Sequence, residues 1–266
     1  MKSIIAGHLN QLWEAQPLVH SITNLVVMNT TANALLAIGA SPIMAHAKEE
    51  VADMVAITGS LVINTGTIAS DQLESMILAV EAAKEHGKPW VLDPVGAGAT
   101  PYRLASNREL LNYQPSVVRG NGSEIAALFT DNSERRGKGA DSTDSSDSTL
   151  QFLQEKAAEH NMVIAVTGAT DYITDGQQLV KLENGHPMMA KVTGTGCTAT
   201  ALIGAFLAVC SQPLEAATAG LACLGLAGEQ ASKACPGPGS LQLRLLDELY
   251  QLSQDHLIKG LKISTD

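Results

Sequence analysis

The feature that most constrains the fold is the alternation of short β-rich runs with longer helical patterns. The β-rich runs lie at 17–22, 41–45, 60–66, 89–95, 116–120 and 162–168. Helical patterns between them lie at 29–39, 71–87 and 121–129, and the second ends on Gly87, a residue that often follows the last helical turn. Such alternation is typical of crossover units around a parallel sheet. The sequence therefore predicts an α/β fold with a mainly parallel central sheet flanked by helices.

The pattern changes after residue 168. Residues 171–185 predict an antiparallel hairpin that turns at Asp175-Gly176. Three helices then follow at 196–210, 213–234 and 239–258, with CPGPG separating the last two. The middle helix is rich in Ala and Gly on every side, so we expect it to be buried or packed closely against another helix.

One stretch, 132–149, is polar, rich in Ser and Asp, and without periodicity, which predicts a mobile surface loop. A lid over a nucleotide is the alternative interpretation, because Arg135, Arg136 and Lys138 could meet phosphates. No shift in composition marks a domain boundary, so we expect one domain over residues 1–266.

Composition and charge exclude several partners. The net charge is −10 and no cluster of Lys and Arg occurs, so the chain's own field opposes binding to nucleic acid or an anionic membrane. The four cysteines are spaced 13, 13 and 12 residues apart without a Cys-x-x-Cys pair, which indicates neither a zinc site nor a disulfide framework. No apolar run is long enough for a signal peptide or a membrane span, and we expect a soluble cytoplasmic protein.

Polar residues follow several predicted strands, where ligands bind in open α/β sheets. Asp93 fits either a Mg²⁺ ligand or a cap for the following turn. Glu124 fits either a metal-directed carboxylate or a capping box with Asn121. Arg119 ends a buried strand, where an arginine more often binds an anion than lies on a surface. Thr167 ends a strand in the same way and is weak evidence by itself.

The segment TGTGC, 193–197, opens a long apolar helix. Gly194 and Gly196 bracket Thr195, so free amides and the positive end of the helix dipole should meet there and receive a phosphoryl group. The same field should lower the pKa of the Cys197 thiol. Three roles for Cys197 remain open at this point: a packing residue, a covalent nucleophile, or a weak general base. By composition alone packing ranks first.

Upstream, His20 and Asn24 could simply satisfy backbone groups at a strand end. Met28 and Met44 would ordinarily be core filler rather than ligand contacts.

The motifs become informative in combination. They are HSITNLVVMNTTANALLAIGASPIM, INTGT, LDPVGAGAT, RGNGSEI, VTGATDYITDG and VTGTGCTATALIGAFLA, in this order along the chain. Together they resemble the hydroxyethylthiazole kinase family, thiamine-salvage enzymes with a ribokinase-like, three-layer fold. The resemblance covers most of the chain and departs from the family only near 132–149 and in the C-terminal tail.

The resemblance implies transfer of the ATP γ-phosphoryl group to the hydroxyl of 5-(2-hydroxyethyl)-4-methylthiazole. It also implies a role for each matching residue: Asp93 and Glu124 near Mg²⁺, Arg119 and Thr167 at the ATP phosphates, and Met44, Asn24 and Gly194 around the thiazole. Cys197 stands where related kinases of this fold carry an aspartate base. The family is similar in being trimeric, which implies a homotrimer with pockets completed by a neighbouring subunit.

A thiol is adequate in that position because phosphoryl transfer depends mainly on positioning and charge stabilisation. The rival enzymes of this fold, hydroxymethylpyrimidine kinases and nucleotide-dependent dehydratases, carry Asp at the position of Cys197. A nucleotide sensor without turnover is a rival of a different class. A Rossmann-type dinucleotide binder is excluded because no Gly-x-Gly-x-x-Gly follows the first strand.

Overall fold

The computed structural model of the chain describes residues 1–130 and 147–266. Its centre is a nine-stranded sheet in the order β2-β1-β3-β4-β5-β6-β7-β8-β9. The first six strands pair in parallel: β1 (Leu18–Ile22), β2 (Ser41–Ile43), β3 (Ser60–Asn64), β4 (Trp90–Asp93), β5 (Val117–Asn121) and β6 (Val163–Thr167). The predicted mainly parallel sheet is therefore confirmed.

Three antiparallel strands extend this sheet, β7 (Asp171–Thr174), β8 (Leu179–Leu182) and β9 (Ile263–Thr265). The turn between β7 and β8 contains Gly176 at φ 92°, in the left-handed region that favours glycine, which confirms the predicted hairpin. Strand β9 was not predicted, because three residues at the end of a chain carry no readable alternation.

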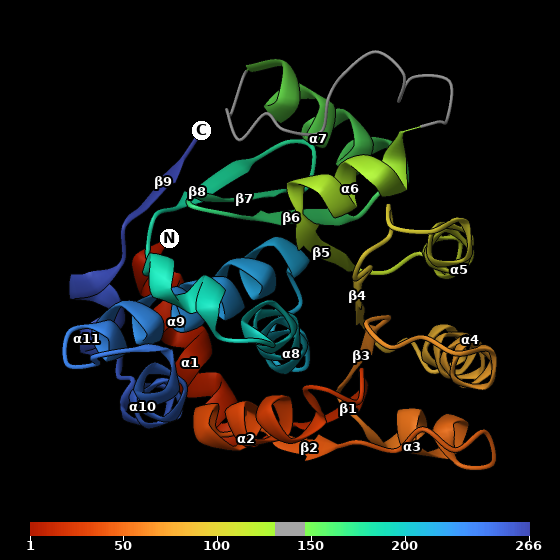
Figure 1. Cartoon of the computed structure of the whole chain (residues 1–266), viewed down its shortest axis with the longest axis horizontal. Coiled ribbons are helices and arrows are strands. Elements are labelled where there is room, and N and C mark those ends of the chain that lie inside the picture. The colour runs from red at the N-terminus through yellow and green to blue at the C-terminus, as the bar shows by residue number, and fades with distance from the viewer. Residues whose placement is uncertain (131–146) are drawn as a thin grey trace.

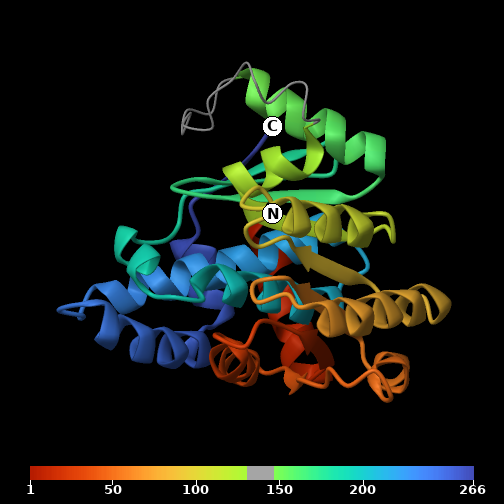
Figure 2. The same ribbon diagram turned by 45° about the vertical axis from the view of Figure 1, so that its right-hand side comes forward.

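The central strands of the sheet are buried on both faces, and their side chains alternate between two cores. In β3, for example, Val62 belongs to one core while Leu61 and Ile63 belong to the other. One layer of helices contains α1 (Lys2–Ala15), α2 (Met28–Ile38), α8 (Thr195–Leu207), α9 (Pro213–Ser232), α10 (Pro238–Gln251) and α11 (Gln254–Gly260). The other contains α3 (Val51–Ile57), α4 (Ser70–Glu85), α5 (Pro101–Leu111), α6 (Gly122–Phe129) and α7 (Asp147–His160). Figures 1 and 2 show the two layers on opposite sides of the sheet.

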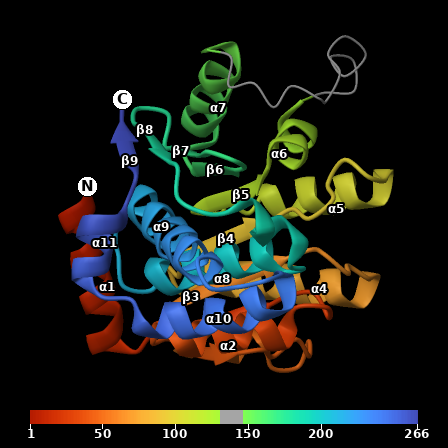
Figure 3. The ribbon, with the colours of Figure 1, turned by 60° about the vertical axis from the view of Figure 1, so that its left-hand side comes forward.

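The Ala- and Gly-rich helix α9 is buried along nearly its whole length, as predicted. A Cβ on Gly220 would lie 2.7 Å from the backbone nitrogen of Ile203 in α8, so the small residues allow the two helices to pack closely. Figure 3 shows α1 beside α11, at the end of the molecule where both termini lie.

Two element predictions are wrong. The predicted helix 239–258 is divided into α10 and α11, because Ser253 starts a new helix by accepting a hydrogen bond from the His256 N–H (3.2 Å). The last residues of the predicted loop 132–149, namely 147–149, form the first turn of α7, with Asp147 at its N-terminal end. The remainder of that loop, including the basic residues of the lid alternative, lies outside the described residues.

Among the described residues, no helix is both long and apolar enough to cross a membrane.

Candidate active site

Buried polar side chains at the carboxyl ends of the parallel strands form a hydrogen-bonded chain that also includes a residue of helix α8. Asn24, two residues after β1, donates from Nδ2 to Oδ1 of Asn64 at the end of β3 (2.8 Å). Asn64 donates in turn from Nδ2 to Oδ2 of Asp93 at the end of β4 (2.7 Å). Thr200 of α8 donates from Oγ1 to the same carboxylate oxygen (2.8 Å). The parallel register brings these residues together, since the carboxyl ends of such strands share one edge.

Asp93 is the acid of this group, and its side chain has no solvent exposure. Its side chain bonds to Asn64 and Thr200 rather than to the following turn, so the turn-cap alternative lacks support in the described part of the chain. Burial raises the pKa of Asp93 to about 6, although the nearby Arg119 guanidinium opposes that shift. Its second oxygen, Oδ1, is buried and has no hydrogen-bond partner among the described residues.

Arg119 lies beside Asp93, in the middle of β5 and not at the strand end that the sequence predicted, and is only 9% exposed. Its Nη1 is 3.6 Å from Asp93 Oδ2, and its Nη2 donates to Oγ1 of Thr167 at the end of β6. A Cβ on Gly196 would lie 2.6 Å from Arg119 Nη1. Glycine at residue 196 therefore lets the guanidinium lie directly against the first turn of α8. Arg119 and Gly196, which the sequence predicts to contact an anion, therefore lie side by side.

Helix α8 begins after Gly194, whose φ of 84° suits glycine. A Cβ at Gly194 would also lie 2.6 Å from Cγ1 of Val27. The first hydrogen bond of the helix runs from the Thr198 N–H to the Gly194 carbonyl (2.8 Å), so the amides of residues 195–197 precede it and lack acceptors within the helix. These amides and the positive end of the helix dipole lie beside Arg119, an arrangement suited to binding an anion.

Cys197 lies in this first turn and is partly buried. Its Sγ accepts a hydrogen bond from Nδ2 of Asn24 (3.3 Å). The expected lowering of the Cys197 pKa is wrong: burial of the sulfur, and then the Asp93 carboxylate, raise that pKa above its ordinary value. A thiol with a raised pKa is protonated near neutral pH, which disfavours the role of Cys197 as a covalent nucleophile.

Glu124 forms the capping box that the sequence suggested. Its Oε2 accepts from the Asn121 N–H (2.8 Å), and its own N–H donates to Oδ1 of Asn121 (2.9 Å). Its Oε1 also accepts from the N–H of Gly96, in the turn after β4 (2.8 Å). The cap thus fixes a carboxylate near Asp93, where its negative charge helps to raise the Asp93 pKa. Glu124 can therefore cap α6 and also lie where a carboxylate directed at a metal ion would be.

Met44 follows β2 at the same sheet edge but takes no part in the hydrogen-bonded chain. His20 of β1 is fully buried, and its Nε2 donates to the Ala45 carbonyl next to Met44 (2.8 Å). This contact holds the segment after β2 against β1. Burial lowers the pKa of His20, which keeps the ring neutral. The local interpretation of His20, that it satisfies a backbone group, is confirmed.

Sequence reasoning missed several residues of the site. Asn64 ends a strand, as Asp93 does, and the same rule would have identified it. Thr200 lies one helical turn after Gly196, a spacing that identifies it only once α8 is known to face Asp93. Asp171 begins β7, accepts from the Gly168 N–H (2.9 Å) and lies near Arg119. Arg103 of α5 donates to the carbonyls of Thr65, Gly66 and Val95, joining the turns after β3 and β4.

Known proteins resemble this chain along most of its length. The model of the hydroxyethylthiazole kinase family matches residues 9–255. Hydroxyethylthiazole kinase of Desulfotalea psychrophila is 49% identical over 259 residues, covering 97% of this chain and 94% of the relative. The corresponding protein of Granulibacter bethesdensis is 55% identical over 244 residues, covering 92% of this chain and 88% of the relative.

Solved structures resemble the chain in the same way. The structure of hydroxyethylthiazole kinase from Pyrococcus horikoshii has a TM-score of 0.90 at 44% identity, covering 98% of each chain. A ribokinase-like superfamily protein from Enterococcus faecalis has a TM-score of 0.65 at 15% identity, covering 96% of this chain and 95% of the other, and shows the fold alone. The predicted ribokinase-like fold is thereby confirmed. The chain is a kinase, and it belongs to the hydroxyethylthiazole kinase family.

Proposed function

We propose that the chain transfers the γ-phosphoryl group of ATP to the primary hydroxyl of 5-(2-hydroxyethyl)-4-methylthiazole, as a step of thiamine salvage in the cytoplasm. The observation that carries the proposal is the contact between Arg119 and the first turn of α8, where Gly196 has no Cβ. A guanidinium and free helix amides at one point are suited to stabilise charge on a migrating phosphoryl group.

In this proposal Arg119 and Thr167 bind the ATP phosphates. The Nε of Arg119 is buried and has no partner in the described ranges, so the guanidinium retains a donor for phosphate oxygens. Thr167 holds the guanidinium through its Oγ1, which fixes the direction of the remaining donors.

Asp93 and Glu124 would hold Mg²⁺. They fit that ion because both are carboxylates, the hard oxygen ligands that Mg²⁺ prefers, and because Asp93 Oδ1 has no partner in the described part of the chain. When bound, the ion would neutralise part of the phosphate charge. Asn64 and Thr200 both donate to Asp93 Oδ2, which fixes the carboxylate and leaves Oδ1 available.

Asn24, Met44 and Gly194 would surround the thiazole, with its hydroxyl beside Cys197. A neutral thiol is a poor base, so the Cys197 sulfur orients the acceptor hydroxyl instead of removing its proton. This suffices because the transition state of phosphoryl transfer is loose and depends mainly on positioning. Asn24 fixes the sulfur through its Nδ2.

We also propose a homotrimer in which a neighbouring subunit completes each thiazole pocket. Leu25 and Val26, directly after Asn24, are 70% and 65% exposed in the isolated chain. Adjacent exposed apolar side chains at the rim of a site are suited to contact with another subunit.

The test of the proposed activity is ADP release by the purified chain with ATP, Mg²⁺ and the thiazole alcohol. We expect ADP formation that depends on the alcohol and does not occur when a hydroxymethylpyrimidine replaces it. Binding of ATP without ADP release would identify a sensor, and turnover of the pyrimidine would identify a different kinase. Either result would contradict the proposal.

A further inference from the structure

Three side chains capable of binding metal meet at the end of the molecule opposite the candidate active site. They come from separate segments: His8 from α1, Cys210 from the turn between α8 and α9, and Glu215 from the first turn of α9. One ligand atom from each residue lies within 4.8 Å of the other two. We propose that His8, Cys210 and Glu215 form a binding site for a transition-metal ion of the Zn²⁺ type.

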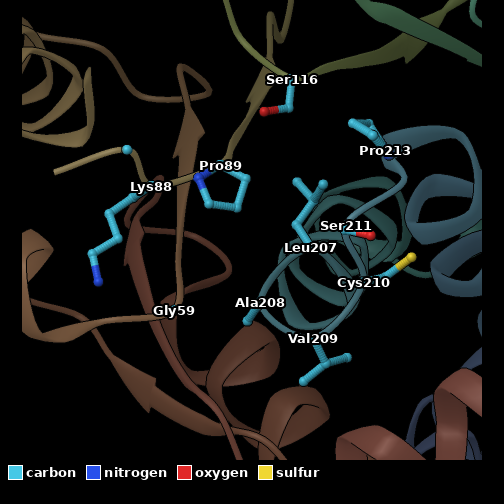
Figure 4. Close-up of a pocket in the computed structure, with 11 residues that line it drawn as sticks. Gly59, Lys88, Pro89, Ser116, Leu207, Ala208, Val209, Cys210, Ser211 and Pro213 are labelled. Carbon is cyan, nitrogen blue, oxygen red and sulfur yellow. The ribbon is translucent and has the colours of Figure 1, made fainter. Parts of the chain in front are cut away.

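This cluster is separate from the phosphoryl-transfer site. Cys210 follows the C-terminal end of α8, whereas Cys197 lies in its first turn, and a helix of 13 residues spans about 20 Å. Cys210 also borders a cavity of about 560 Å³, lined by Lys88, Pro89 and Ser116 among others. Figure 4 shows the sulfur pointing away from Lys88 and Pro89, so the cluster lies beside this cavity and not inside it.

The distances approach those of a tetrahedral metal site. Zn–N, Zn–O and Zn–S bonds of about 2.0–2.3 Å imply ligand-to-ligand distances of roughly 3.3–3.6 Å. The Cys210 Sγ is 3.4 Å from His8 Nε2 and 3.9 Å from Glu215 Oε2. The Cys210–Glu215 pair must therefore close by about 0.3 Å, and the third pair, His8 Nε2 to Glu215 Oε2 at 2.7 Å, must open by less than about 1 Å.

The chemistry of the donors selects the class of ion. One imidazole nitrogen, one thiolate and one carboxylate oxygen form a mixed set that suits Zn²⁺ and similar borderline ions. Ca²⁺ and Mg²⁺ prefer sites made of oxygen alone. The His8 and Glu215 side chains are 13% and 27% exposed, which leaves an open side for a water molecule as the fourth ligand.

The histidine is already oriented for such a role. Its Nδ1 lies 2.9 Å from Oε1 of Gln11, one turn further along α1, so Gln11 fixes the ring with Nε2 directed at the other two residues. A hydrogen bond at the second ring nitrogen is the usual partner of a metal-bound histidine. The ion would bind the unprotonated Nε2 of His8 and the thiolate of Cys210, so the thiol proton, together with any proton on Nε2, would pass to solvent.

The same geometry disfavours a catalytic triad. In a triad the acid holds the ring nitrogen remote from the nucleophile. Here Cys210 and Glu215 both contact Nε2, so the three groups converge on one point. A metal bound at this point would join α1 to α9 and to the turn before it, and would stabilise the packing of α1 on α9.

The test uses the full chain, freed of metal with a chelator and titrated with Co²⁺, followed by competition with Zn²⁺. A cysteine ligand produces a thiolate-to-Co²⁺ charge-transfer band, which we expect to saturate at one equivalent and to disappear when Zn²⁺ is added. Cys210→Ser removes the band. Cys235→Ser, a change of the same kind at a cysteine outside the cluster, retains it.

Two further variants keep the test decisive where Cys210→Ser folds poorly. His8→Gln abolishes binding, and Gln11→Ala weakens it by roughly 10-fold to 100-fold, as the loss of a supporting hydrogen bond does in other metal sites. Zn²⁺ also raises the Tm of the wild-type chain but not that of His8→Gln. Absence of the band in the wild type, or an unchanged band in either Cys210→Ser or His8→Gln, overturns the proposal.

Discussion

At the level of single residues, the proposed mechanism assigns the orientation of the acceptor hydroxyl to Cys197. Its sulfur is a neutral hydrogen-bond partner held by Asn24. We predict that Cys197→Ala lowers kcat by about tenfold while the KM for the thiazole changes by less than about threefold, since orientation is lost and the pocket remains. We predict that Cys197→Asp keeps or raises kcat because a carboxylate adds a stronger base.

Steady-state kinetics of both variants check this prediction, with Cys235→Ala as the matched control. Recovery of a covalent phosphoryl-cysteine from the wild-type chain would contradict the orienting role, and so would complete loss of turnover in Cys197→Asp.

Asp171 carries a second prediction, about stability. Burial raises its pKa to about 6 in the folded chain, compared with 3.8 for the free side chain. Between these pH values the folded state binds more protons than the unfolded state, so the free energy of unfolding falls as the pH rises. Asp171→Asn removes this effect and keeps an acceptor for the Gly168 N–H.

Urea unfolding of both chains at several pH values measures the difference. Relative to Asp171→Asn, we expect the wild-type chain to lose up to about 3 kcal/mol between pH 4 and pH 7. Parallel pH profiles for the two chains would show that the Asp171 pKa is close to its ordinary value.

The residues that sequence reasoning found share one property. Asp93 and Thr167 end their strands and Arg119 lies two residues before the end of β5, and polar residues near strand ends are visible in the printed sequence. Thr200 is not visible in this way, because its role depends on which face of α8 meets the sheet. The Cys197 pKa was predicted in the wrong direction because burial and the nearby Asp93 charge depend on tertiary packing.

At the scale of elements, the first turn of α8 is the part most sensitive to added volume. We predict that Gly196→Ala lowers kcat/KM roughly 100-fold, because the new Cβ would lie 2.6 Å from Nη1 and displace the Arg119 guanidinium. Gly7→Ala is the matched control, since this glycine also lies in a helix but has open space around its Cβ position. It should keep full activity and gain about 0.5–1 kcal/mol of stability.

Kinetics and thermal unfolding of the two variants check this prediction. Equal activity in Gly196→Ala and the wild type would mean that contact between Arg119 and α8 is dispensable for catalysis.

Elements differ in how far the sequence could predict them. The parallel strands were predicted because uninterrupted apolar runs between helical patterns leave few alternatives. Helices α3 and α5 were not predicted, because α3 has only 7 residues and α5 has weak apolar periodicity. The division between α10 and α11 depends on a single serine cap, a local signal that a long helical pattern conceals.

At the scale of the whole molecule, the proposed trimer makes a prediction about mass. Size-exclusion chromatography with light scattering should give three times the chain mass of 27.8 kDa. Leu25→Asp should reduce the mass to that of one chain and raise the KM for the thiazole, because the pocket loses its neighbouring subunit. Ile57→Asp is the matched control, since Ile57 is similarly exposed at 66% but ends α3 just before β3, at the amino ends of the parallel strands.

A monomeric wild-type chain, or a Leu25→Asp chain with unchanged mass and KM, would contradict this arrangement.

The central claim is that the first turn of α8 and Arg119 receive the charge of the migrating phosphoryl group. The most direct test is a crystal structure of the chain with ADP, Mg²⁺, aluminium fluoride and the thiazole alcohol. We expect the fluoride group to bind against the amides of residues 195–197 and the Arg119 guanidinium, with the alcohol oxygen beside the Cys197 sulfur. A fluoride group bound elsewhere, with those amides directed away from it, would rule out this role for α8 and Arg119.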